Sequence, residues 1–160
     1  MEIHSFPPIS SPSSRILILG TMPGQDSLRQ QQYYAHHRNA FWPLMFKIFE
    51  QSYTDNYTAK QNLLLSRHIA LWDTLQSCIR SSSLDSDIQM EKPNQLSDFL
   101  REHQLISHIF FNGQKAGQFF KKYTVDVQLP QIILPSTSPA HAISFSNKLN
   151  HWSIIKTYTD

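Results

Sequence analysis

Side chains that could do chemistry gather in four short segments, and each segment directly follows an apolar run. The four segments are residues 20–39, 73–77, 112–116 and 135–141. The first contains Tyr34 and Asn39, and the second begins with Asp73. An amide can orient a water molecule by accepting a hydrogen bond from it, whereas an ionised carboxylate only accepts hydrogen bonds. We expect the chemistry of the protein in these segments, because they resemble ordinary connecting loops least.

The first segment has two glycines after an apolar run, Gly20 and Gly24, which makes a phosphate-binding loop the obvious alternative. The Walker pattern requires Gly-Lys-Ser/Thr and the dinucleotide fingerprint requires G-x-G-x-x-G, and neither is present. A long polar and aromatic loop instead leads to Asn39. Loops of that kind are usually functional rather than mere connectors.

Metal, thiol and Schiff-base chemistry are not indicated. The eight histidines include the adjacent pair His36 and His37, but they form no H-x-x-x-H pair, and Cys78 is the single cysteine. Residues 74–78 are interpreted as a helical turn, in which Cys78 would be structural. No lysine lies in the first or the fourth segment. The sequence therefore predicts an activity without a metal or a cofactor.

Alternating strands and helices must position the four segments. Continuous apolar runs, typical of strands buried on both faces, occur at residues 16–19, 68–72, 106–111 and 131–134. Apolar residues at helical spacing occur at residues 41–49, 96–100, 116–123 and 145–155. This alternation predicts an α/β fold, a three-layer α/β/α sandwich with a central, mostly parallel four-stranded sheet. Ligands bind at the carboxyl ends of such strands, where all four segments lie.

The composition fits one soluble domain. The chain has 160 residues, and 14 Lys and Arg against 12 Asp and Glu give a net charge of +2, which permits nucleic-acid binding without arguing for it. A single cysteine excludes a disulfide framework, and no apolar run is long enough to span a membrane. We expect a cytoplasmic monomer. Residues 1–160 would form a single domain with an extended N-terminal arm at 1–14 and an exposed loop at 81–87.

Several blocks of sequence, in order between residues 15 and 158, give the chain a specific resemblance. They are Leu-Gly-Thr-Met-Pro-Gly (19–24), Tyr-Tyr-Ala-His-His-Arg-Asn-Ala-Phe-Trp (33–42), Ala-Leu-Trp-Asp (70–73) with Leu-Gln-Ser-Cys (75–78) and Ser-Leu-Asp-Ser (83–86), Phe-Asn-Gly-Gln-Lys-Ala (111–116) and Leu-Pro-Ser-Thr-Ser-Pro-Ala (134–140). Together they resemble the uracil-DNA glycosylase superfamily, most of all its hypoxanthine-DNA (deoxyinosine) glycosylase branch. They are also similar to the mismatch-specific uracil/thymine glycosylases.

The resemblance implies a base pocket and a catalytic amide. Asn39 would position the hydrolytic water, although from the sequence alone it would be an N-cap of the following helix. Asp73 would recognise the flipped base, although it could also be only a helix cap. Tyr34 would stack on the base, although it could also be an ordinary half-buried aromatic residue. The base pocket implied in this way comprises Gly20, Thr21, Met22, Pro23, Tyr34 and Asp73.

The resemblance also implies DNA contacts, which a plain Ser/Pro-rich loop and a solvated surface lysine would explain equally well from composition alone. The implied contacts are Ser27, Lys115, Pro135, Ser136, Thr137, Ser138, Pro139 and His141. The small residues of the 135–140 segment would let backbone N–H groups approach phosphates.

Four positions depart from the family pattern. Met22 stands where a water-positioning Asp or Asn is usual, and Leu134 where uracil-specific members have a catalytic His. His141 replaces an Asn that commonly follows Pro-Ala, and His37 replaces a Pro that often follows Ala-His. The departure at Met22 is the reason for assigning the water to Asn39.

The sequence thus predicts a monofunctional DNA glycosylase that binds duplex DNA, extrudes a deaminated base and hydrolyses its N-glycosidic bond. Hypoxanthine is the favoured substrate, and uracil or mismatched thymine is the alternative. A second alternative is a catalytically idle nucleic-acid-binding module on the same fold, which would not need Asn39, Tyr34 and Asp73 together.

Overall fold

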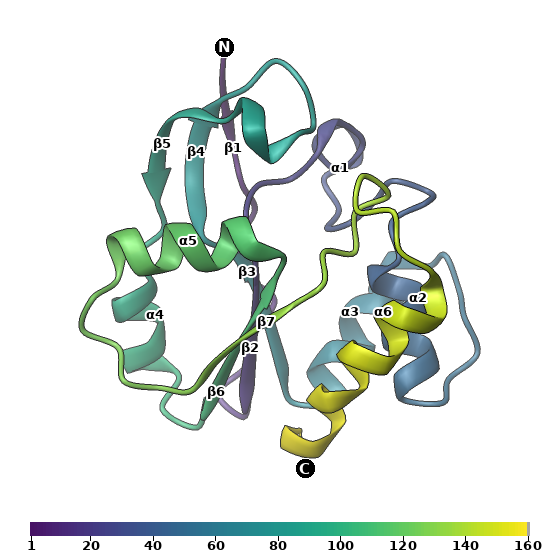
Figure 1. Cartoon of the computed structure of the whole chain (residues 1–160). Coiled ribbons are helices and arrows are strands. Elements are labelled where there is room, and N and C mark those ends of the chain that lie inside the picture. The colour runs from purple at the N-terminus through teal and green to yellow at the C-terminus, as the bar shows by residue number, and fades with distance from the viewer. Residues whose placement is uncertain (160) are drawn as a thin grey trace.

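Four parallel strands form the central sheet of the molecule (Figure 1). The structure is a computed structural model that describes residues 1–159. The strands are β2 (Ile16–Gly20), β3 (Ile69–Asp73), β6 (His108–Asn112) and β7 (Gln131–Leu134). Their order is β3-β2-β6-β7, and each neighbouring pair is parallel. The predicted strands and their parallel pairing are confirmed.

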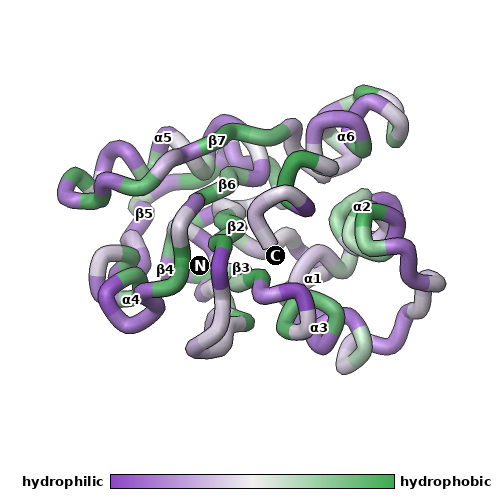
Figure 2. Tube along the Cα trace, turned by 90° about the horizontal axis from the view of Figure 1, so that it is seen from below, coloured by the Kyte–Doolittle hydropathy of each residue, from purple (hydrophilic) through white to green (hydrophobic). Residues whose placement is uncertain are grey.

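Helices cover both faces of this sheet, which explains why its apolar runs do not alternate. The helices are α1 (Gln25–Gln30), α2 (Phe41–Ile48), α3 (Tyr57–Ser66), α4 (Leu96–Glu102), α5 (Gln114–Tyr123) and α6 (Phe145–Trp152). Ile16 and Ile18 pack in one core with α2, α3 and α6, whereas Leu17 and Leu19 pack in another with α4 and α5. Figure 2 shows the sheet between these two helical layers. The predicted three-layer sandwich is therefore confirmed.

A small antiparallel sheet was not predicted. It has the order β1-β4-β5 and consists of β1 (Glu2–His4), β4 (Leu75–Ile79) and β5 (Gln89–Pro93). The interpretation of residues 74–78 as a helical turn was wrong, because this segment pairs with a strand on each side. Cys78 is buried in β4, where it packs with Leu75 and Phe119.

Residues 1–14, for which the sequence predicts an extended arm, are bound to other parts of the chain. Beyond β1, the backbone of Ile9 exchanges two hydrogen bonds with Leu71 of β3 (2.9 and 2.8 Å). Phe6 and Ile9 are buried in the core. The carbonyl of Pro7 accepts a hydrogen bond from the Tyr33 hydroxyl (2.8 Å), so the arm supports the loop that leads to Tyr34.

Short helical turns complete the chain at η1 (Asp85–Asp87) and η2 (Ser153–Tyr158). Two helices begin at side-chain caps, since Asn56 accepts the Ala59 N–H (2.9 Å) and Ser144 accepts the Asn147 N–H (3.1 Å). Among residues 1–159, no helix has the length and apolar character that a bilayer crossing requires.

Candidate active site

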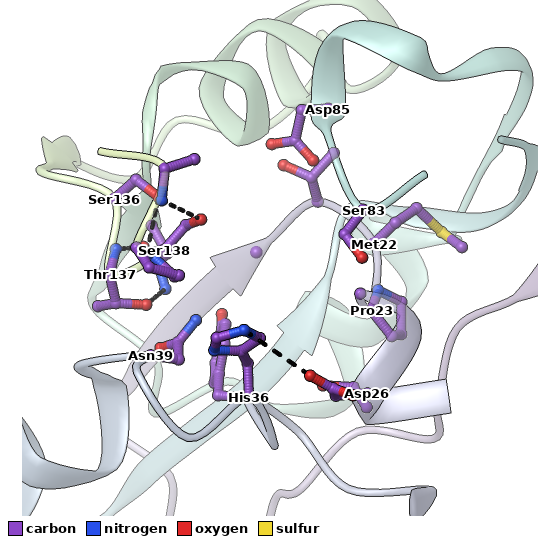
Figure 3. Close-up of a pocket in the computed structure, with 18 of the residues that line it drawn as sticks. Met22, Pro23, Asp26, His36, Asn39, Ser83, Asp85, Ser136, Thr137 and Ser138 are labelled. Carbon is purple, nitrogen blue, oxygen red and sulfur yellow. Dashed lines mark hydrogen bonds and ion pairs between the residues drawn. The ribbon is translucent and has the colours of Figure 1, made fainter. Parts of the chain in front are cut away.

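A cavity of about 660 Å³ opens at the carboxyl ends of β2, β3 and β6, where the sequence predicted the chemistry (Figure 3). Its volume lies in the range usual for ligand sites. All predicted site residues except Lys115 and Pro135 line it. The Lys115 ammonium lies 5.0 Å from the centre of the Phe119 ring, and the Pro135 carbonyl accepts a hydrogen bond from Trp152 Nε1 (2.8 Å).

Asp73 and Tyr34 lie close to Gly20 and together with it form one wall of the cavity. A methyl group on Gly20 would lie 2.6 Å from Asp73 Oδ1 and 2.7 Å from the Tyr34 hydroxyl. Only a residue without a side chain therefore fits at the end of β2. The nearby Met22 side chain packs in the core with Leu75, so it offers the cavity no polar group.

Three polar atoms at this wall are buried and, among residues 1–159, have no hydrogen-bond partner. They are Asp73 Oδ2, the Tyr34 hydroxyl and Thr21 Oγ1. Leaving a buried polar group unpaired costs roughly 1–3 kcal/mol, so most proteins avoid it. One acceptor and two hydroxyls in the same cavity therefore lack partners. This indicates that the cavity binds a polar ligand, which would supply those partners.

Burial and neighbouring charges tune these groups. Burial, followed by the negative charge of Asp85, raises the pKa of Asp73 to about 7, while the Arg80 guanidinium opposes the rise. Burial, followed by the charge of Asp73, raises the pKa of Tyr34, so its hydroxyl keeps its proton and can donate. Perturbed carboxyls in clefts are typical of functional sites.

Asn39 occupies a turn just before α2, and its side-chain amide is held there. Its backbone N–H donates to the carbonyl of His36 (2.9 Å), and its Oδ1 accepts from the Phe41 N–H (2.9 Å). Figure 3 shows the side chain at the cavity, beside His36. The second lone pair of Oδ1 and the Nδ2 group remain for a ligand or a water molecule. The bond from the Phe41 N–H therefore fixes the amide that lines the cavity.

The 135–141 loop is fixed to the sheet through Thr137, which is fully buried. Thr137 Oγ1 accepts from Asn112 Nδ2 and its N–H donates to Asn112 Oδ1, each at 2.9 Å. The Thr137 carbonyl accepts the Ala40 N–H (3.0 Å), which joins the loop to the residue after Asn39. Beneath the loop, the buried Lys148 ammonium donates to the Ser138 carbonyl (3.1 Å).

Thr137→Val is expected to lower the free energy of unfolding by roughly 1–3 kcal/mol. Valine preserves the shape of the side chain but leaves Asn112 Nδ2 buried without its acceptor. Urea denaturation at neutral pH measures the change. Ser136→Ala in the same loop is the control, because the Ser136 hydroxyl is only part-buried and serves one local bond. Equal stability of Thr137→Val and wild type would contradict this account.

Three backbone N–H groups of this loop already have hydrogen-bond partners within the loop. The N–H groups of Ser138, Ala140 and His141 donate within the loop, to Ser136 Oγ (3.2 Å), Ser138 Oγ (3.1 Å) and the Ser138 carbonyl (3.0 Å). Serine hydroxyls compete for nearby backbone donors in this way. The hydroxyl hydrogens of Ser136 and Ser138 are then the donors left for a ligand.

Sequence reasoning missed several residues that line the cavity, among them Asp26, His36, Asp85 and Asn112. Asn112 ends β6 and begins the predicted 112–116 segment, but the sequence assigned this side chain no role. Asp85 lies in the 83–86 block of the family resemblance, but the sequence assigned it no role, because residues 81–87 are expected to form an exposed loop. His36 Nε2 lies 3.8 Å from Asp26 Oδ2 at the rim. Among residues 1–159, no group of three metal-ligating side chains occurs.

Comparison with known proteins gives consistent matches over nearly the whole chain. Residues 7–160 match the family model described as the Uracil DNA glycosylase superfamily. Proteins described as hypoxanthine DNA glycosylases are 32% identical: one from Methanosarcina barkeri over 154 residues (96% of this chain, 97% of the relative) and one from Methanosarcina acetivorans over 153 residues (95% and 96%).

A solved structure is similar to the same extent. The solution NMR structure of a candidate uracil DNA glycosylase from Methanosarcina acetivorans has a TM-score of 0.87 and 31% sequence identity, and 99% of each chain is covered. The similarity therefore includes every segment that lines the cavity.

Proposed function

Because this chain belongs to the uracil DNA glycosylase superfamily and is thus a DNA glycosylase, we propose that it removes hypoxanthine from DNA. The observation that carries the proposal is the group of unpartnered atoms at Asp73, Tyr34 and Thr21. Hypoxanthine presents an N1–H donor beside an O6 acceptor. An ionised carboxylate next to two hydroxyl donors is complementary to that edge. The description of the two relatives as hypoxanthine DNA glycosylases supports the same choice.

Tyr34 would hold the flipped base by stacking. Phe41 lies against its ring, with 4.3 Å between ring centres and 28° between planes. The supported ring would present its remaining face and its hydroxyl to the cavity. Stacking contributes roughly 1–3 kcal/mol per base and accepts any base, so recognition is left to the polar edge.

Asn39 would hold the attacking water. In the reaction the C1′–N9 bond breaks, its electron pair leaves with the base, and the water oxygen bonds to C1′. One water proton is released, and the departing base takes up a proton. An oxocarbenium-like sugar needs only a weak, well-positioned nucleophile. The bond from the Phe41 N–H fixes the Asn39 amide before substrate arrives, which is the preorganisation that such a role requires.

Base release from duplexes that carry inosine opposite each normal base tests the proposal, with alkali used to reveal abasic sites. We expect hypoxanthine release, and matched duplexes with uracil or mismatched thymine measure the alternative substrates, since uracil also has an N–H beside a carbonyl. An undamaged duplex is the control. Faster release of uracil than of hypoxanthine would assign the chain to the alternative, and no release from any duplex would favour an idle binding module.

Binding to DNA is expected to depend only weakly on salt, with a log–log slope of about −2 to −4, equivalent to two to four neutralised phosphates. The net charge is only +2, Arg29 at the cavity is paired with Asp26, and Lys148 is buried beneath the loop. Titration of a non-specific duplex between low and physiological salt measures the slope. A slope near −8 would reveal a basic DNA-binding surface elsewhere.

A further inference from the structure

One carboxylate of the cavity has no place in the function proposed above. Asp85 begins η1 in the otherwise exposed 81–87 segment, yet it is half-buried and lines the cavity. Figure 3 shows it on the side of the cavity opposite Asn39. Burial raises its pKa, and the positive charges of Arg80 and Lys115 oppose that rise. Partial burial of a carboxylate costs free energy, so its position at a ligand site suggests a role in that site.

The segment that carries Asp85 is fixed against the cavity. Ser82 Oγ donates to Asp87 Oδ2 (2.5 Å), which closes the turn on its solvent side. The Gln25 N–H donates to Ser83 Oγ (2.9 Å), which ties the turn to the start of α1. Asp85 and Asp87 thus lie in one short turn, but only Asp85 lines the cavity.

Asp85 and Asp73 line the same cavity, and the negative charge of Asp85 opposes ionisation of Asp73. The other charged group that acts on Asp73 is Arg80 after β4, and the charge of Asp73 in turn raises the pKa values of Tyr33 and Tyr34 in the loop after α1. Arg80 Nη2 donates to the Pro23 carbonyl, and its Nε and Nη1 are buried without a hydrogen-bond partner among residues 1–159. The fixed guanidinium favours the ionised form of Asp73, and Asp85 opposes it.

The protonation of Asp73 changes which base edge it can meet. When ionised, it accepts from a lactam N–H such as N1–H of hypoxanthine, but it repels the N1 lone pair of adenine. When neutral, it donates from one oxygen and accepts at the other, and this arrangement pairs equally well with the N1 and N6–H₂ edge of adenine. Discrimination between the two purines therefore depends on the proton at Asp73 Oδ2, the atom left without a partner.

We propose that Asp85 is a specificity-determining residue that acts through Asp73, by setting the fraction of the protein in which Asp73 carries a proton. This inference rests on the proposed removal of hypoxanthine, and it concerns the choice between lactam and amidine bases at the same site. The positive charge of Arg80 has the opposite effect on Asp73. The two charges together set the pH above which the pocket prefers hypoxanthine over adenine.

The test is the ratio of single-turnover rates on inosine and adenosine duplexes, in the same mismatch, from pH 5.5 to 9. In the wild type the ratio should rise with pH through about 7, where Asp73 ionises. Asp85→Asn removes a negative charge, so Asp73 ionises at lower pH and the midpoint of the ratio should move downward, by on the order of one pH unit. Asp87→Asn, in the same turn but exposed, should leave the midpoint unchanged.

Two further variants make the result unambiguous. Asp73→Asn should abolish the pH dependence of the ratio, because the titrating group is gone, and Arg80→Gln should move the midpoint upward. A midpoint that does not move in Asp85→Asn overturns the inference, as does a change in the ratio that is equal at every pH. Absence of hypoxanthine release from the wild type would instead refute the proposed function.

Discussion

Asn39→Ala is expected to keep DNA affinity and to lose base release by on the order of 100-fold, as when one positioned polar group that acts in the transition state is removed. The amide is held at the cavity by the Phe41 N–H, whereas the Met22 side chain packs in the core and offers the cavity no polar group. Single-turnover release of hypoxanthine, together with binding to the same duplex, separates the two effects.

The control variant is Asn39→Ser, because the Asn39 side chain also accepts the first N–H of α2. Serine is a good capping residue and retains an oxygen for the Phe41 N–H, but it has no amide. Stability should recover in Asn39→Ser while the rate stays low. Near wild-type rates in either variant would show that Asn39 is a cap alone.

Asp73→Asn is expected to reduce the preference for hypoxanthine over adenine by roughly 1–3 kcal/mol, which is about 5- to 150-fold. A carboxamide can rotate and present a donor to the adenine N1, which the ionised carboxylate repels. The ratio of single-turnover rates on mismatched inosine and adenosine duplexes at pH 8.5 measures the effect. At this pH the wild-type carboxyl is ionised, since its pKa is about 7.

Asp26→Asn is the matched control for that experiment. Asp26 lines the same cavity, but it is paired with Arg29, so its loss should leave the ratio unchanged. Equal ratios in Asp73→Asn and the wild type would place the selectivity elsewhere in the pocket. A purely capping role for Asp73 is already ruled out, because the segment after it is β4 and not a helix.

The sheet could be predicted because a strand that is buried on both faces has a continuous run of apolar residues. Ile16 to Leu19 are all fully buried, with alternate side chains in two different cores, so no polar residue interrupts the run. The rule that ligands bind at strand carboxyl ends then located the cavity. For Asn39, capping α2 and lining the cavity were treated as alternatives; the N-cap is Ala40, and the Asn39 side chain accepts the Phe41 N–H and lines the cavity.

The small sheet and the role of Asp85 could not be predicted, because they depend on contacts between segments that are distant in the sequence. Leu75–Ile79 becomes a strand because residues 2–4 and 89–93 pair with it. Asp85 acts as a site residue only because η1 is brought against the ends of the sheet. The loop N–H groups are taken by Ser136 and Ser138, a competition that composition alone does not reveal.

The residues that anchor the 135–141 loop are synthesised after the strands of the sheet, so the loop can be fixed only after the sheet. Lys148 and Trp152 of α6 hold the carbonyls of Ser138 and Pro135, so a nascent chain that has emerged only to residue 134 contains all four strands of the sheet but neither anchor. Domains form largely as their segments leave the ribosome. The 135–141 loop is then fixed after the sheet, so an unfinished chain has the strands of the scaffold but lacks one wall of the cavity.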